Sequence, residues 1–338
     1  MNRAKRVFKT AIALLAATLS IGLASEALIR QRVAAKFPAP GRLVDIGGRR
    51  IQIDCRGSGS PTVVLESGLD MLGSLSWATV HDSIAKTTRV CAYSRAGIMW
   101  SDPSSAPFSS GSVARDLRAA LRSAGERAPF IMVGHSLGGP YVTVFTRLYP
   151  SEVAGLVLVD ASHPDQVARM ERATGVSMTP PTGALAFAAN IARTGALRFV
   201  PSDFAQPNAP TVVHEAPAAL AVTSLAALLQ ETRALHSTFA TAGEFRQLGD
   251  RPLIVLTAMA PLSPEMLAAQ HMNREQESSK QAAWKALQQD ESTWSRRGRQ
   301  ILVPDATHYI QFDRPDVVIA AVRDVVCAVR IGRPACRS

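Results

Sequence analysis

Residues 134–139 read Gly-His-Ser-Leu-Gly-Gly and constrain this chain more than any other stretch. A short apolar run, residues 130–133, precedes them, and a helix-compatible segment, residues 140–148, follows. A G-x-S-x-G sequence between a strand and a helix places its serine on a sharp, strained turn with the hydroxyl above the end of a sheet. The glycines on either side let strand and helix cross closely. The pattern predicts Ser136 as a nucleophile; the alternative is a glycine-rich turn with an incidental serine.

Apolar runs alternate with helix-compatible segments along most of the chain. A hairpin is predicted over residues 42–55 because the flanks alternate in polarity around Gly47 and Gly48. Further strands are predicted at residues 62–66, 89–93, 130–133, 153–159, 252–257 and 299–303. Such nearly continuous apolar runs are typical of strands buried in a parallel sheet. Between them, Ser112 is predicted as the N-cap of a helix that ends at Arg122.

Residues 164–248 interrupt this alternation. The segment is rich in alanine and leucine, prolines divide it, and apolar residues recur at helical spacing near residues 184–197 and 218–235. We therefore expect a helical cap over the carboxyl edge of the sheet. The cap divides the core domain into a first part, residues 42–163, and a second part, residues 249–338.

The first 27 residues resemble an export signal or an N-terminal membrane anchor. Basic residues at positions 3, 5, 6 and 9 precede an apolar run over residues 11–24, and small residues follow it. The run is short for a membrane span, which needs about 20 residues. A cleaved signal and a retained anchor both stay open, and either predicts that the rest of the chain is extracytoplasmic, periplasmic or secreted. Residues 28–41 are predicted as a linker.

The charge pattern and the cysteines indicate which classes of partner and which cellular compartment to expect. The formal net charge is +10, yet no basic stripe with interleaved aromatic residues is present, so no nucleic-acid partner is expected. Four cysteines fit an oxidising compartment. Cys327 and Cys336 flank a glycine/proline turn and are predicted to bridge. Cys55 and Cys91 are also candidates, and four reduced thiols remain the alternative, because sequence does not fix connectivity.

A serine nucleophile needs a base, and the base needs a carboxylate to orient it. His308 follows the last predicted strand, which delivers its side chain to the same sheet edge as the serine. Asp160 ends the strand after the elbow and is the predicted acid. The loop after residues 252–257 holds no carboxylate before Glu265, which is the alternative acid. The remaining candidates are Asp165 and Asp290.

An oxyanion hole needs two backbone N–H groups, one just after the nucleophile and one from a loop after an early strand. Leu137 supplies the first by its position. Leu69 is the predicted second donor, because Gly68 permits a close turn directly after the strand over residues 62–66. The alternative is an ordinary glycine turn.

Five stretches carry a resemblance to a known family: residues 65–68 (LESG), 89–97 (RVCAYSRAG), 134–139 (GHSLGG), 156–164 (LVLVDASHP) and 307–308 (TH). Over residues 42–330 the chain resembles the α/β-hydrolase superfamily, in its single-serine esterase/lipase-like branch. The resemblance implies a mostly parallel eight-stranded sheet with helices on both faces, and a helical cap after the sixth strand. It also implies that the strands carrying Cys55 and Cys91 are adjacent. In some dehalogenase-like relatives the acid follows the sixth strand, which favours Asp160.

Two departures from the family pattern lie in one loop. Ser94 stands where relatives often have aspartate, and Met99 replaces a small residue. These differences leave the shape of that loop open.

The expected function is that of a serine hydrolase that cleaves an ester or related acyl bond through Ser136, His308 and Asp160. No cofactor and no metal are expected. The expected substrate is a small acyl compound, apolar to match the cap. An acyltransferase, a lactonase, an amidase and a non-catalytic ligand-binding protein are the alternatives.

Overall fold

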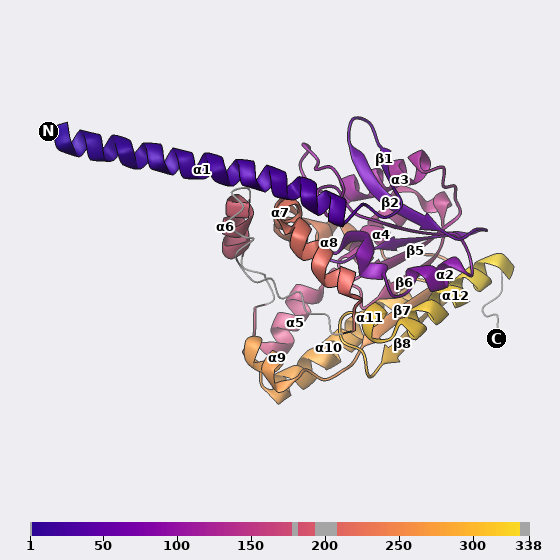
Figure 1. Cartoon of the computed structure of the whole chain (residues 1–338). Coiled ribbons are helices and arrows are strands. Elements are labelled where there is room, and N and C mark those ends of the chain that lie inside the picture. Colours follow the sequence, from indigo (N-terminus) through magenta and orange to yellow (C-terminus); the bar gives the residue numbers. More distant parts are fainter. Residues whose placement is uncertain (1, 178–181, 193–207, 332–338) are drawn as a thin grey trace.

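A computed structural model describes residues 2–177, 182–192 and 208–331 (Figure 1). Its centre is one eight-stranded sheet with strand order β1-β2-β4-β3-β5-β6-β7-β8. The strands are β1 (Arg42–Asp45), β2 (Arg50–Arg56), β3 (Thr62–Glu66), β4 (Val90–Tyr93), β5 (Phe130–His135), β6 (Val153–Val159), β7 (Leu253–Ala258) and β8 (Gly298–Val303). Strand β2 is antiparallel to both of its neighbours, and the pairs from β4 to β8 are parallel. The predicted mostly parallel α/β sheet is confirmed.

Both faces of the sheet are buried, because alternate residues of each strand point in opposite directions. On β5, Phe130 and Met132 join one apolar cluster, whereas Ile131 and Val133 join the other. Helices α3 (Ser110–Ser123) and α4 (Gly138–Leu148) cover the first face. Helices α2 (His81–Ala85) and α12 (Pro315–Ile331) cover the second. The continuous apolar runs follow directly from this double coverage.

The remaining helices of the core lie around the end of the sheet that carries the site. Helix α10 (Arg274–Thr293) packs against β7 and β8. Two short helices, α9 (Pro264–Ala269) and α11 (Ile310–Asp313), follow β7 and β8, respectively. Helix α3 begins one turn earlier than predicted, since Ser109, not Ser112, is its N-cap. Ser112 completes a reciprocal capping box by accepting from the Ser109 backbone.

Between β6 and β7, within the predicted cap, the described residues form four helices: α5 (Gln166–Thr174), α6 (Thr182–Ala192), α7 (Thr211–Arg233) and α8 (Leu235–Gly243). Among the described residues, α7 is the one helix that is long and apolar enough to cross a membrane, by length and composition only. However, 39% of the most apolar stretch of this helix is buried within the fold, as expected for a helix that packs on a core.

Helix α1 (Asn2–Lys36) extends away from the body of the molecule (Figure 1). It differs from the predicted linker over residues 28–41, because the helix continues to Lys36 and residues 37–41 alone join it to β1. The physical reason is that residues 28–36 contain no helix breaker; the first is Pro38.

Cys55 and Cys91 form a disulfide between the adjacent strands β2 and β4, where they are direct cross-strand partners. This pairing was one of the open alternatives. The predicted bridge between Cys327 and Cys336 lies outside the described residues, because Cys336 does.

The loop that carries Ser94 and Met99, the two departures from the family pattern, is held by hydrogen bonds. The Ser94 hydroxyl donates to Gln52 Oε1 (2.7 Å), and the Met99 amide donates to Ser224 Oγ of α7 (2.9 Å).

Candidate active site

Ser136 lies at the carboxyl end of β5, on a turn that few residue types adopt. Its φ is +52°, in the left-handed region that costs a side-chain-bearing residue free energy. The neighbouring glycines make the turn possible. A Cβ on Gly134 would lie 2.6 Å from the Gly138 carbonyl oxygen, and one on Gly138 would lie 2.5 Å from the Glu66 carbonyl oxygen. The turn is tied to β6, since the Ser136 amide donates to the Val159 carbonyl (3.2 Å).

Asp160 and His308 meet at the same edge of the sheet. Asp160 directly follows β6, and His308 lies in the loop between β8 and α11. His308 Nδ1 is 2.7 Å from Asp160 Oδ2. The other oxygen, Asp160 Oδ1, accepts from the Ala258 amide (2.9 Å) and from the Trp284 indole N–H (2.8 Å). Asp160 is 3% exposed, and both of its carboxylate oxygens have hydrogen-bond partners, so the carboxylate is held in one orientation.

The other candidate acids are engaged elsewhere. Glu265 is exposed on α9, where a hydrogen bond from Ser263 lowers its pKa. Asp165 pairs with Arg246 of the segment before β7 (2.8 Å). Asp290 accepts from the buried His163 ring (2.8 Å). Among the residues that the structure describes, Asp160 is the one carboxylate in hydrogen-bond contact with His308.

The serine and the histidine lie at the same sheet edge without a direct bond. Within the described part of the chain, no hydrogen bond joins Ser136 Oγ to His308 Nε2. Catalytic hydrogen bonds are often long before substrate binds, so this geometry leaves the histidine available as a base. The His308 side chain is 45% exposed, which leaves its ring accessible.

The two predicted oxyanion donors lie beside Ser136. Leu137 is the N-cap of α4, so its amide is at the end of a helix that has unpaired N–H groups. Leu69 and Leu137 line one cavity together with Ser136. Gly68 packs directly against Ser136, because a Cβ there would lie 2.9 Å from Ser136 Cβ. Neither leucine amide donates to another described residue, which leaves both free for a ligand oxygen.

Two further residues hold this site and were not predicted. Trp284, on α10, orients Asp160 as described above. His135 donates from Nε2 to the His308 carbonyl (2.9 Å) and so fixes the backbone of the histidine loop. Burial lowers the pKa of His135 well below its ordinary range, so the ring is neutral, which suits this single donor role. The glycine-His-Ser sequence contained His135, but nothing in the sequence indicated its partner.

Buried carboxyl groups surround the site, and burial raises the pKa of each. The pKa is about 7 for Glu66, whose main chain precedes the Leu69 turn, and about 6 for Asp70, directly after it. For Glu291, near Asp160, burial raises the pKa well above its usual range. Burial thus favours the neutral form of each of these carboxyl groups over its charged form.

A cavity of about 1280 Å³ opens between the cap and Ser136. Core residues Leu69 and Leu137 and cap residues Val167, Leu235 and Phe239 supply an apolar part of its lining. The same apolar side chains pack in one cluster that joins cap and core. The cavity therefore offers an apolar surface directly beside the candidate nucleophile.

The described residues contain one group with metal-ligand spacing: Cys55, Cys91 and Glu126. The two cysteines are joined as a disulfide and supply no thiolate, so this group does not fit a metal ion.

The model of the α/β-hydrolase-fold family matches residues 61–207, the stretch from β3 through the elbow into the cap. The chain has the α/β-hydrolase fold. The sheet order, the elbow after β5 and the helices inserted after β6 are the parts of that fold described above.

Solved structures agree with this assignment to the α/β-hydrolase fold. A thermophilic esterase from Thermogutta terrifontis is 18% identical, with a TM-score of 0.58 over 83% of this chain and 94% of that protein. An enol-lactonase from Burkholderia xenovorans LB400 is 16% identical, with a TM-score of 0.57 over 85% of this chain and all of that protein (100%). At these identities the similarity establishes the fold.

Among curated proteins, an uncharacterised protein of Schizosaccharomyces pombe is 31% identical over 163 residues. The match covers 40% of this chain and spans 30% of the length of that relative.

Proposed function

We propose that this α/β hydrolase is a serine hydrolase that cleaves an ester or a related acyl bond. The observation that carries the proposal is the 2.7 Å contact between His308 Nδ1 and Asp160 Oδ2 at the sheet edge that also presents Ser136 on its strained turn. A serine becomes a useful nucleophile when a base takes its proton, and that base works best when a carboxylate fixes its tautomer.

The reaction proceeds in two halves. His308 Nε2 takes the proton of Ser136 Oγ while the oxygen attacks the carbonyl carbon, and the Leu69 and Leu137 amides donate to the resulting oxyanion. The C–O bond to the leaving alcohol then breaks, and His308 returns its proton to that alcohol. Water, deprotonated by His308, attacks the acyl-enzyme and releases the acid and free Ser136. Asp160 stabilises the imidazolium in both halves.

The substrate class follows from the lining of the cavity. Apolar side chains from cap and core lie beside Ser136 in the 1280 Å³ cavity, so we propose a small acyl compound with an apolar acyl or alcohol group. Each additional buried methylene is expected to add about 0.8 kcal/mol of binding free energy until the apolar lining is filled.

The test uses the full-length chain, purified in detergent, and its Ser136→Ala variant. We expect fluorophosphonate labelling of the wild type and none of the variant, together with hydrolysis of p-nitrophenyl esters that improves with acyl length before it declines. A folded wild type that neither labels nor hydrolyses any ester would refute the proposal and favour the non-catalytic binding protein. Preferential transfer to an added alcohol or amine would favour an acyltransferase.

We also propose that the first 27 residues direct the body of the chain to the far side of a membrane. Support comes from α1, whose apolar side chains at Phe8, Leu14 and Ile21 are between 64% and 68% exposed. Membrane fractionation combined with N-terminal sequencing of the mature chain tests this. A chain in the cytoplasm with an intact N-terminus would refute it; an intact membrane-bound chain indicates an anchor, and a shortened chain a signal.

A further inference from the structure

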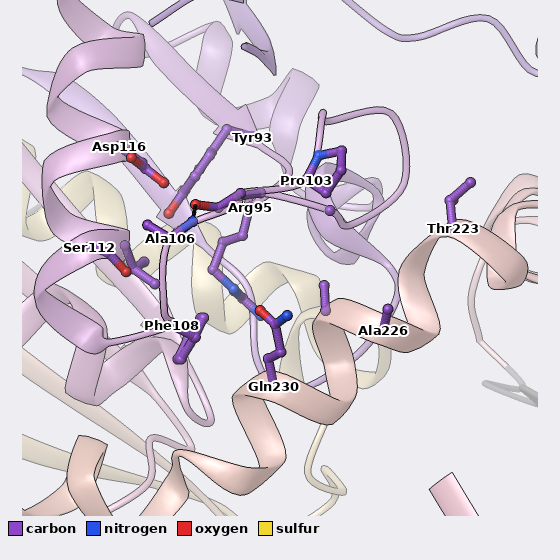
Figure 2. A pocket seen from close by; sticks show the side chains of 15 residues that line it. Tyr93, Arg95, Pro103, Ala106, Phe108, Ser112, Asp116, Thr223, Ala226 and Gln230 are labelled. Carbon is purple, nitrogen blue, oxygen red and sulfur yellow. Dashed lines mark hydrogen bonds between the residues drawn. The ribbon is translucent and has the colours of Figure 1, made fainter. Parts of the chain in front are cut away.

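Three ionisable side chains are buried together where cap and core meet. Arg95, in the loop after β4, is 3% exposed, and Glu66 of β3 and Glu231 of α7 are each 1% exposed. Arg95 Nε and Nη2 donate to the two oxygens of Glu231 (2.9 and 2.8 Å), and Nη1 donates to Glu66 Oε1 (2.8 Å). Figure 2 shows the Arg95 side chain extending from its loop toward α7, beside Gln230. Ionisable groups are tolerated in a protein interior where hydrogen bonds such as these satisfy them.

The same guanidinium holds the loop that carries Leu69. Arg95 Nη2 donates to the Gly68 carbonyl oxygen (2.6 Å), and Nη1 donates to the Ser67 carbonyl oxygen (2.8 Å). The Gly68 carbonyl and the Leu69 N–H belong to one peptide unit, which is planar and trans, so the two groups point in opposite directions. Arg95 therefore fixes the direction of the Leu69 N–H through the carbonyl on the other side of the same plane.

Glu231 is the member of this group that belongs to the cap. Its two oxygens accept from Nε and Nη2 along one edge of the guanidinium, a bidentate arrangement that fixes the plane of that group. The Nη2 atom that contacts Glu231 is also the one that holds Gly68. Tyr141 of α4 adds a longer contact to Glu231 (3.5 Å).

We propose that Arg95 and Glu231 are positioning residues for the oxyanion hole, so that the cap must be docked for the Leu69 amide to point at the reacting oxygen. This inference rests on the serine hydrolase function proposed above. Glu231 acts through Arg95, and Arg95 acts through the Gly68–Leu69 peptide; neither touches the substrate. The cap thus contributes to turnover itself, in addition to lining the cavity.

The test compares Glu231→Gln with Ser224→Ala in the full-length chain. Both residues lie on α7 and both tie the cap to the core, but Ser224 Oγ contacts the Met99 amide and not Arg95. For a p-nitrophenyl ester we expect Glu231→Gln to lower kcat about 10- to 100-fold with KM within about threefold, since loss of a whole oxyanion donor costs 10²–10³. The Ki of a trifluoromethyl ketone, whose serine adduct places an oxyanion in the hole, should rise in proportion. Ser224→Ala should change kcat by less than about threefold.

Several outcomes would overturn the inference while leaving the serine hydrolase intact. These are a folded Glu231→Gln variant with wild-type kcat and Ki, a change in KM alone, or an equal loss of kcat in Ser224→Ala. If Glu231→Gln does not fold, Glu231→Asp keeps the buried charge but withdraws the carboxylate by one methylene, and is judged by the same criteria. A wild type without hydrolysis or labelling would instead remove the proposed function, and this inference with it.

Discussion

Asp160 and His308 are 148 positions apart in the chain, yet His308 Nδ1 lies 2.7 Å from Asp160 Oδ2. The contact forms because β6 and β8 end at the same edge of a parallel sheet, with β7 between them. The loop after β7 holds no carboxylate before Glu265, and the carboxylate that contacts His308 comes instead from Asp160, directly after β6.

Asp160→Asn should reduce kcat by about 10³- to 10⁴-fold with little change in KM, because the amide favours the wrong histidine tautomer. The measurement is the steady-state rate on a short p-nitrophenyl ester, alongside the rate of fluorophosphonate labelling. Glu265→Gln on the exposed α9 is the matched control and should retain wild-type rates. The reverse result, a slow Glu265→Gln and an unaffected Asp160→Asn, would assign the acid to Glu265.

Trp284→Phe should lower kcat about tenfold, because it removes one hydrogen bond to the charged carboxylate of Asp160, a bond worth about 1.5–3 kcal/mol, and leaves the Ala258 amide in place. The control is Trp294→Phe, which removes an equivalent indole bond to Asp290 (3.2 Å), away from His308. Steady-state kinetics of both variants decide the matter. Equal effects in the two would mean that Trp284 serves stability alone.

Gly68→Ala should abolish most activity, because the added Cβ would lie 2.9 Å from Ser136 Cβ and 3.1 Å from His135 Nδ1. Such overpacking typically costs about 1–3 kcal/mol of stability, so a folded variant is expected. Gly183→Ala on α6 is the control, since no atom of the described residues lies within 4 Å of its added Cβ. Turnover and thermal unfolding are measured together. A Gly68→Ala variant with wild-type turnover would contradict the functional importance of the close packing of this turn on Ser136.

Glu66 should make the free energy of unfolding depend on pH. Burial raises its pKa from 4.5 to about 7, against the opposing effects of Arg95 and Tyr93, so the folded chain holds this proton more tightly than the unfolded chain. The resulting stabilisation is complete below pH 4.5 and is lost as the pH rises to 7.

Urea unfolding of wild type and Glu66→Gln at several pH values measures this dependence. Because glutamine does not titrate, the wild type should lose about 3 kcal/mol relative to Glu66→Gln between pH 4.5 and pH 8. A constant difference between the two proteins over this range would show that the proton at Glu66 is not linked to folding.

The sequence predicted the parts of the fold that depend on local pattern. Apolar runs such as residues 153–159 are long enough to identify a buried strand, and the paired glycines around Ser136 identify a strained turn. Because parallel strands share a carboxyl edge, the placement of Asp160 and His308 at that edge followed from strand order. The extent of α1 was missed because export signals and helices share their composition.

The contacts that hold the site could not be predicted in the same way. Trp284 and Asp160 are 124 positions apart, and Arg95 and Glu231 are 136 apart. Each pair depends on how a cap or core helix is rotated against the sheet, and that rotation is decided by side-chain packing rather than by periodicity. In the sequence alone, Arg95, Glu66 and Glu231 cannot be distinguished from charged residues on the surface.

The cap and the carboxylate that holds His308 leave the sheet from the same strand. Asp160 is the residue after β6, and α5 begins at Gln166, with the buried His163 between them. In a chimera that exchanges caps between two such chains, a crossover within β6 would transfer the carboxylate together with the cap, as one cassette. A crossover after His163, with re-entry before β7, would transfer the cap alone. The fold thus sets a recombination boundary only a few residues wide. Beyond this boundary the cap can change in sequence while Asp160 is inherited unchanged.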